Sequence, residues 1–197
     1  MKRLAIFDFD HTLITGDSFL PFLAFAAGRA QTYAALAEAL TLLGIRKAQH
    51  KVPQGARSFL KSHLLYRLLS GKKRDALHDA AAQTRLWQTE NTSILRRLHD
   101  HHDRGDTVLI ASGGLNLYLP ESLRDIPHDA LICTDIGVEN GVVTGDMING
   151  NCVRQCKAER VASWMTVNGV FEETFAYGNY PHDLPMLNLV QHRVIVS

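Results

Sequence analysis

The chain has 197 residues, of which 46% are hydrophobic and 21% are charged, and its formal net charge is +1 at pH 7. These values are ordinary for one globular domain or for a core with one insertion, and they provide no general electrostatic field that attracts nucleic acid. The densest basic run, residues 72–74, is short enough to be a solvated helix end or turn. We therefore predict no nucleic-acid partner.

The cysteines and the apolar runs bear on the compartment. The three cysteines are an odd number without the spacing of a zinc site, and a strand-like run begins close to the N-terminus, where no secretory signal precedes it. We therefore expect reduced thiols and a cytoplasmic location. The apolar runs 19–27 and 33–45 are shorter than the ~20 residues that a spanning helix needs, so we expect no transmembrane segment.

The first expected element is a short buried strand, Leu4–Phe7, which an acidic motif at residues 8–12 follows directly. Side chains at positions i and i+2 of an extended chain point the same way, so Asp8 and Asp10 should emerge together while Phe9 turns to the other side. Adjacent carboxylates repel each other, but they suit a site where one attacks, one moves protons and a divalent cation offsets their charge. Alone, the motif is equally compatible with a solvated acidic turn.

About a hundred residues separate this strand from the next strand-like run, far more than one crossover helix requires. The segments between them carry no strand signal and predict helices at 19–27, 33–45, 54–69 and 73–86, followed by a helix at 90–102. We therefore expect an all-helical cap domain at residues 17–92, inserted into a core domain formed by residues 1–16 and 93–197.

Three histidines, His99, His101 and His102, lie at the expected end of helix 90–102, next to two aspartates. Such a cluster can bind a metal, but basic side chains are also favoured at the negative pole of a helix. We expect these histidines at the surface, as helix-end residues.

The later apolar runs predict the rest of a sheet. Strands are expected at 107–111, 130–135, 174–177 and 193–196, and the Asn-Gly pair in 138–145 predicts a β-hairpin. Strands that alternate with helices favour a mainly parallel sheet covered on both faces. The expected fold class is therefore α/β, with a Rossmann-like parallel-sheet core and the inserted helical cap.

Three further motifs follow these strands. The run 107–111 ends in Ser112-Gly113-Gly114, where glycine lets the backbone approach an anion closely. Lys157 lies at the start of an expected helix, where a cation opposes the helix dipole. The run 174–177 leads into Asn179 and Asp183. Ligands of open parallel sheets bind beyond the carboxyl ends of the strands, so these motifs can converge there.

The four motifs, in this order over residues 8–187, resemble those of the haloacid dehalogenase-like hydrolase superfamily: Asp-x-Asp-x-Thr, a strand ending in Ser-Gly-Gly, an isolated Lys, and Gly-x-x-x-x-Asp-Leu-Pro-Met-Leu. More narrowly, the chain resembles subfamily IB, the branch that contains phosphoserine phosphatase. This resemblance implies a Mg²⁺-dependent phosphatase that hydrolyses a phosphomonoester through an aspartyl-phosphate intermediate. It implies Asp8 as nucleophile, Asp10 as general acid and base, Ser112, Gly113 and Lys157 as phosphate-binding residues, and Asp8, Asp10, Asn179 and Asp183 as metal ligands.

The last motif departs from the family pattern, which has Asp at the position of Asn179 as a direct magnesium ligand. An amide oxygen can still coordinate Mg²⁺, but without charge, and one charge at about 4 Å is worth roughly 4 kcal/mol at an effective dielectric of 20. We therefore expect weaker metal binding, with Asp183 holding metal-bound water or moving inward.

The substrate and the alternatives depend on fewer residues. Asp17 stands where phosphoserine phosphatases carry Glu, and Phe19, Phe22 and Phe25 could form one apolar stripe at the cap entrance or serve as cap core. We expect a small-molecule or lipid phosphomonoester and disfavour phosphoserine. Two alternatives remain, a receiver-like phosphoacceptor module and a non-catalytic relative that binds phosphorylated ligands; a dehalogenase is disfavoured because it needs no second Asp or metal.

Overall fold

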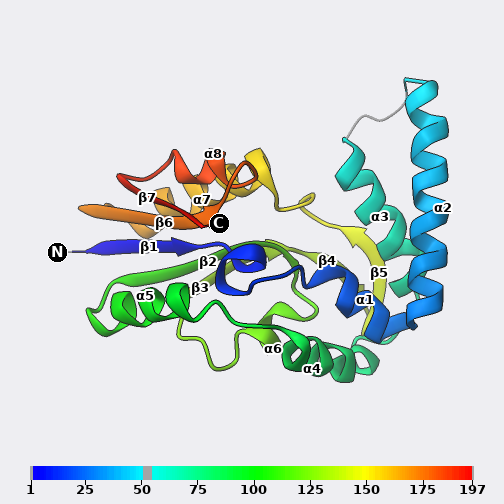
Figure 1. The fold of residues 1–197 in the computed structure, drawn as a ribbon, viewed down its shortest axis with the longest axis horizontal. Helices are drawn as coiled ribbons and strands as arrows, with labels where there is room; N and C mark the ends of the chain where they lie inside the picture. The colour runs from blue at the N-terminus through cyan, green and yellow to red at the C-terminus, as the bar shows by residue number, and fades with distance from the viewer. Residues whose placement is uncertain (1, 51–54, 197) are drawn as a thin grey trace.

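The computed structural model describes residues 2–50 and 55–196 and contains a five-stranded parallel sheet (Figure 1). The strand order is β3-β2-β1-β6-β7, so the first strand is central and pairs with β2 and β6. The fold class is α/β, as the sequence predicts. The bounds of the strands are β1 (Arg3–Phe7), β2 (Thr107–Leu115), β3 (Ala130–Thr134), β6 (Glu173–Asn179) and β7 (His192–Val196).

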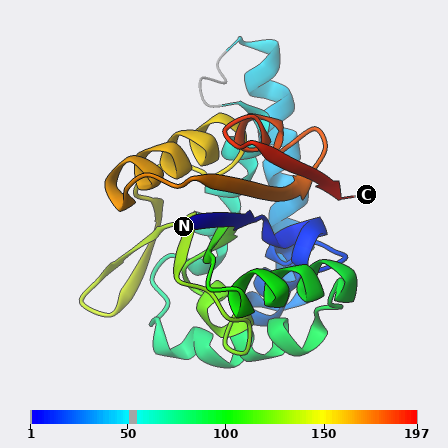
Figure 2. The same cartoon turned by 90° about the vertical axis from the view of Figure 1, so that its left-hand side faces the viewer.

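The apolar sequence of β1 suits a central strand that is covered on both faces. Ala5 and Phe7 belong to one apolar cluster, whereas Leu4 and Ile6 belong to another. In Figure 2, α7 (Arg154–Asn168) and α8 (Leu184–Leu187) cover one face of the sheet, and α5 (Thr92–Asp103) covers the other. A strand buried on both faces needs continuous rather than alternating hydrophobicity, which explains why the short run was recognisable.

The described residues between β1 and α5 form four α-helices: α1 (Phe19–Ala27), α2 (Arg29–Ala48), α3 (Ala56–Leu69) and α4 (His78–Trp87), with the 3₁₀ turn η2 (Asp75–Leu77) before α4. We call α1–α4 the helical insertion. The predicted helix 54–69 begins at Gln54, which lies outside the described residues. Figure 1 places α1–α3 beyond the carboxyl end of the sheet. Among the helices of the described residues, none is both long and apolar enough to cross a membrane.

The predicted hairpin is present as β4 (Ile136–Glu139) and β5 (Val142–Met147). Its turn residues Asn140 and Gly141 have φ values of 51° and 78°, as a tight hairpin turn requires. The hairpin packs against α3, and the backbone N–H of Gly71 donates to Val143 O over 2.9 Å. The hairpin therefore ties the helical insertion to the sheet.

The prediction of three surface histidines is wrong for His101, although His99 and His102 are exposed. His101 lies on the buried face of α5 with Ile94 and Leu98. These three positions follow the i, i+4, i+7 spacing of one helix face. The period of the helix therefore outweighs the attraction of a basic side chain to the helix end.

The short helix α6 (Leu119–Ser122) follows β2. Tyr118, just before it, is fully buried, and its ring centroid lies 4.8 Å from that of Phe22. Phe22 is therefore core, whereas Phe19 lines a pocket and Phe25 is 37% exposed. The three phenylalanines do not form one stripe, because a spacing of i, i+3, i+6 drifts around the helix.

Candidate active site

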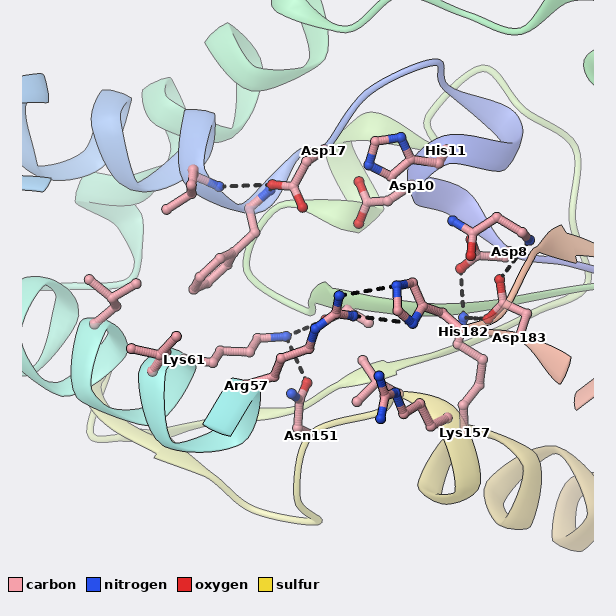
Figure 3. Close-up of a pocket in the computed structure, with 18 of the residues that line it drawn as sticks. Asp8, Asp10, His11, Asp17, Arg57, Lys61, Asn151, Lys157, His182 and Asp183 are labelled. Carbon is pink, nitrogen blue, oxygen red and sulfur yellow. Dashed lines mark hydrogen bonds and ion pairs between the residues drawn. The ribbon is translucent and has the colours of Figure 1, made fainter. Parts of the chain in front are cut away.

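A cavity of about 450 Å³ lies between the carboxyl ends of the strands and the helical insertion (Figure 3). It is lined by residues from each of the four motifs. The predicted site residues that it brings together are Asp8, Asp10, Gly113, Lys157, Asn179 and Asp183. Ser112, the remaining one, is fully buried and is not among the residues that line this cavity.

Asp8 directly follows β1, and its carboxylate is held on both oxygens. Lys157 Nζ donates to Oδ1 over 2.6 Å, and Thr12 Oγ1 donates to Oδ2 over 3.1 Å. Burial raises the pKa of Asp8 to about 6, although Lys157 opposes this shift. The carboxylate is therefore ionised near neutral pH and held in one orientation, as a nucleophile requires.

Asp10 lies in the turn η1 (Phe9–Leu13), which is irregular because Asp10 is extended and His11 has a φ of 57°. Its Oδ1 accepts a hydrogen bond of 2.8 Å from the backbone N–H of Ser18. Burial raises the pKa of Asp10 to about 7, and the neighbouring Asp17 adds to the shift. A carboxyl group with this pKa can both donate and accept a proton near neutral pH.

The Ser-Gly-Gly motif lies within β2 rather than after it, because the strand continues to Leu115 with a register shift against β3. Ser112 Oγ accepts a hydrogen bond of 2.9 Å from the Gly114 N–H, so its hydroxyl fixes the backbone of the motif. A Cβ atom at Gly113 would lie 2.8 Å from Val153 Cγ1. A residue with a Cβ atom would not fit at this position, so glycine allows the backbone of residue 113 to line the cavity.

Lys157 lies in the first turn of α7 and bridges two carboxylates, with Asp183 Oδ1 2.7 Å from its Nζ. Although burial lowers it, the carboxylates of Asp8 and Asp183 hold the pKa of Lys157 above its usual range. Asp183 Oδ2 accepts a hydrogen bond of 3.0 Å from the Asn179 N–H. Both oxygens of Asp183 thus have partners within the protein.

The donor atoms of the cavity fit a hard divalent cation. The described residues hold no group of three or more His, Cys, Asp or Glu side chains arranged as a metal site. Asn179 Oδ1, however, is buried without a hydrogen-bond partner among the described residues, and it lines the cavity with Asp8 and Asp10. A buried acceptor without a partner is costly. Carboxylate and amide oxygens are the ligands that Mg²⁺ prefers.

The motifs did not predict several polar side chains that line the same cavity: Arg57, Lys61, Asn151, Arg154 and His182. The guanidinium of Arg57 lies 3.1 Å from His182 Nε2, so a helix of the insertion contacts the loop after β6. The only sequence signal was the i, i+4 spacing of Arg57 and Lys61 on the predicted helix 54–69. That spacing does not predict the contact between Arg57 and His182, which are 125 positions apart in the chain.

The model of the haloacid dehalogenase-like hydrolase family matches residues 5–188. The chain therefore belongs to this family, which confirms the resemblance. The family assignment also argues against a receiver-type module.

Two curated relatives place the chain more narrowly. It is 29% identical over 191 residues to phosphoserine phosphatase SerB2 of Mycobacterium tuberculosis, covering 94% of this chain and 42% of that protein. It is 27% identical over 212 residues to the histidinol-phosphatase of Neisseria meningitidis serogroup C, covering 100% of this chain and 91% of that one. The chain thus spans about half the length of the first curated relatives that it matches, at 42% and 55%.

Solved structures support the fold. A protein of unknown function from Bordetella pertussis Tohama I superposes with a TM-score of 0.78 at 22% identity, covering 99% of this chain and 90% of that one. A substrate-bound phosphoserine phosphatase superposes with a TM-score of 0.66 at 17% identity, covering 99% and 86%. At these identities the likeness concerns the arrangement of the elements.

Proposed function

We propose that the protein is a magnesium-dependent phosphatase that hydrolyses a phosphomonoester through an aspartyl-phosphate intermediate. The observation that carries this proposal is the pair of carboxyl groups at the end of β1. Asp8 is ionised near neutral pH and bound by Lys157 over 2.6 Å, while Asp10 in the same cavity has a pKa of about 7. Membership of a hydrolase family supports the same conclusion.

In the first step, a carboxylate oxygen of Asp8 attacks phosphorus while the bond from phosphorus to the ester oxygen breaks. Asp10 donates its proton to the leaving alkoxide. Lys157 holds Asp8 in position and places a positive charge near the phosphoryl oxygens. The backbone of Gly113 approaches the phosphate closely, because Gly113 has no Cβ atom.

In the second step, Asp10 accepts a proton from the water that attacks the phosphorus of the aspartyl phosphate. The bond from phosphorus to Asp8 breaks, which releases phosphate and returns both carboxyl groups to their starting states. Mg²⁺, held by the Asp8 carboxylate, the Asp10 backbone carbonyl and the Asn179 amide oxygen, would withdraw charge from the phosphoryl oxygens. The two oxygens of Asp183 accept hydrogen bonds from Lys157 and the Asn179 N–H, so Asp183 would hold metal-bound water rather than the ion itself.

We further propose that residues 17–92 act as a cap domain over a core of residues 1–16 and 93–197. The two chain segments that join them run side by side, with Thr15 N–H donating to Thr89 O over 2.9 Å and Asn91 N–H donating to Leu13 O over 2.8 Å. A movement at these paired segments would open the cavity. Closure would exclude water during the transfer.

The substrate class that the cavity favours is a small-molecule phosphomonoester, with a lipid phosphomonoester as the alternative. We propose that the protein acts in the cytoplasm. The insertion contributes five apolar side chains to the cavity wall, next to the polar Arg57 and Lys61: Phe19, Leu20, Leu36, Leu60 and Leu64. Asp17 Oδ1 accepts from the backbone N–H of Phe19 and Leu20, so its carboxylate also caps α1. Relatives named for phosphoserine and histidinol phosphate are consistent with a compact substrate.

The test is phosphate release from p-nitrophenyl phosphate and from a panel of phosphomonoesters that includes phosphoserine, with and without a chelator. We expect activity that depends on Mg²⁺ and falls by more than about 10³-fold in Asp8→Asn. Asp146→Asn, a change of an exposed aspartate in the hairpin, should leave activity intact. An Asp8→Asn variant within a few-fold of wild type would show that the covalent mechanism is wrong. A folded wild type that binds phosphate but turns nothing over would instead favour the non-catalytic relative.

Phenylalanine truncations test which part of α1 contacts substrate. Phe22→Ala should lower the free energy of unfolding by about 3–5 kcal/mol and leave the substrate ranking unchanged, because Phe22 is fully buried against Tyr118. Phe19→Ala should instead change kcat/KM between substrates with and without an apolar tail. A Phe22→Ala variant of normal stability and altered ranking would contradict this assignment.

A further inference from the structure

Lys61 is a buried cation that the phosphatase mechanism above does not use. It lies on α3 and is 8% exposed. Its three ammonium hydrogens have three acceptors in the sheet region: the Gly113 carbonyl oxygen, Asn151 Oδ1 at 3.0 Å and Thr134 Oγ1 at 3.2 Å. Figure 3 shows the lysine reaching across the cavity wall to Asn151. Its donors are therefore fully occupied by the protein.

The environment of Lys61 does not resemble that of a structural ion pair. All three acceptors are neutral oxygen atoms, and no carboxylate of the described residues is among the hydrogen-bond partners. Burying an ammonium group without a counter-ion is unfavourable, and a well-packed apolar side chain is often more stable in its place. Stability alone therefore does not explain the lysine, whereas an anion bound nearby would supply the missing countercharge.

The acceptor that matters most is the carbonyl oxygen of Gly113. It also accepts a hydrogen bond of 2.9 Å from Thr134 Oγ1. The next N–H in the chain, that of Gly114, donates to Ser112 Oγ over 2.9 Å. Both ends of the Gly113–Gly114 peptide are therefore held, one by Ser112 and the other by Thr134 and Lys61. The glycine backbone at the cavity wall thus owes its orientation partly to a residue of the helical insertion.

We propose that Lys61 is a positioning residue that holds the Gly113 backbone in the orientation that binds phosphate. Through this contact, the packing of α3 on the sheet is coupled to the presence of phosphate. When α3 packs on the sheet, the Gly113 backbone is oriented. The charge of Lys61, which has no carboxylate among its hydrogen-bond partners, then lies beside that backbone. A bound phosphate then stabilises the seated helix in return, since the two events share one free energy of coupling. This inference rests on the proposed function only in that the cavity binds phosphate.

The charge of Lys61 should titrate in an accessible range. Burial lowers the pKa of Lys61 to about 8, and Asp10 and Asp17 oppose the shift. Two thiols also face it, but burial raises the pKa of Cys133 to about 12 and that of Cys152 to about 11. Above pH 8, inorganic phosphate is already dianionic and Asp10, with a pKa of about 7, is already ionised. Loss of the Lys61 charge is therefore the expected change next to the Gly113 backbone.

Calorimetric binding of inorganic phosphate in the presence of Mg²⁺ tests the proposal without requiring turnover. Lys61→Met should weaken phosphate binding by roughly tenfold, the scale of one hydrogen bond to a charged group. Thr134→Val, which removes the second donor to Gly113, should weaken it too, and the double variant should bind little worse than Lys61→Met because both changes act on one carbonyl. Lys47→Met, at an exposed position on α2, is the control.

Lys61→Met binding within twofold of wild type would overturn the proposal, and so would fully additive losses, which would place Lys61 on the phosphate itself. Should Lys61→Met fail to fold, the wild type decides: its affinity for phosphate should fall as pH rises from 8 to above 9, and a flat profile would overturn the coupling. A wild type that binds phosphate with this profile but hydrolyses no ester would refute the proposed function and leave this inference standing.

Discussion

Two buried clusters of charged side chains lie near opposite ends of the central strands, and they differ in the balance of charge. In the pocket cluster, Lys157 Nζ lies between two carboxylates, 2.6 Å from Asp8 Oδ1 and 2.7 Å from Asp183 Oδ1, and the Asp10 carboxyl group lines the same cavity. In the second cluster, which we call the Asp106 cluster, one carboxylate is shared by basic groups. Arg3 Nε lies 2.8 Å from Asp106 Oδ1, and His101 Nδ1 lies 2.8 Å from Oδ2.

The pKa directions follow this balance. Burial dominates at the pocket and raises the pKa of Asp8 to about 6 and of Asp10 to about 7. Burial also acts on Asp106, but the hydrogen bond from His101 and the charge of Arg3 lower the pKa of Asp106 below its usual range. The charges of the Asp106 cluster therefore stabilise the fold, whereas those of the pocket cost stability, as expected of groups that serve the proposed reaction.

The largest expected effect comes from Asp10→Asn. It should slow hydrolysis of alkyl phosphates by about 10²–10⁴-fold, and p-nitrophenyl phosphate less, because a good leaving group needs little protonation. The same variant should raise the free energy of unfolding by roughly 1–3 kcal/mol at pH 8, measured with a chelator, because a neutral amide replaces a buried charge. Equal losses on both substrates would contradict the acid role, and lower stability would contradict the comparison.

Asp106→Asn should show the opposite pattern. Removing the carboxylate leaves Arg3 and His101 without their buried partner, so urea unfolding should show a loss of about 2–4 kcal/mol. Turnover should stay within about twofold of wild type at temperatures where the variant is folded. The control is Glu173→Gln, a half-exposed partner of Arg3 at 3.7 Å, which should cost less than about 1 kcal/mol. A loss of activity in folded Asp106→Asn would show that the two clusters are coupled.

The pH dependence of stability should separate the clusters. The folded pKa values of Asp8 and Asp10, about 6 and about 7, lie above the ordinary 3.8, so the metal-free protein should lose stability as pH rises from about 4 to about 7. Burial lowers the pKa of His101 below the ordinary 6.5, so its contribution is lost as pH falls below 6.5. That of Asp106 is lost below 3.8. In thermal scans with a chelator, Asp10→Asn should reduce the loss of stability between about pH 4 and 7, and Asp106→Asn should reduce the loss below pH 3.8; unchanged pH profiles would refute the assignment.

Much of the fold could be predicted because its signals are local. The strands of a sheet that is covered on both faces are short continuous apolar runs, and the motifs stand at or near their carboxyl ends. The pocket residues Asp8, Asp10 and Asn179 were predictable for this reason. The burial of His101 was also within reach, because Ile94, Leu98 and His101 share one helix face.

The rest depends on contacts between distant segments. Lys61 meets Gly113 and Arg57 meets His182 only after the helical insertion has packed on the sheet, and a helix pattern does not specify what its polar residues reach. Ser112 is off the cavity because the strand continues past Ala111 with a register shift. That shift depends on the pairing with β3, which the local sequence does not show.

The smallest expected effect sharpens the comparison at the pocket itself. Asn179→Asp would add a carboxylate beside Asp8 and Asp183, at the position where Asn179 Oδ1 lies buried without a hydrogen-bond partner among the described residues. Without metal, the added charge should lower the free energy of unfolding, because a buried carboxylate is unfavourable here. The raised pKa of Asp8, caused by burial and by the charge of Asp183, shows the same effect. With metal, it should tighten Mg²⁺ binding by about tenfold or more in calorimetric titration, because a charged ligand replaces a neutral one. Asn149→Asp, at an exposed position after the hairpin, is the matched control and should change neither quantity. Tighter binding together with lower metal-free stability would place the cation at Asn179. Unchanged affinity would indicate that Asp183, rather than residue 179, is the direct ligand of the metal.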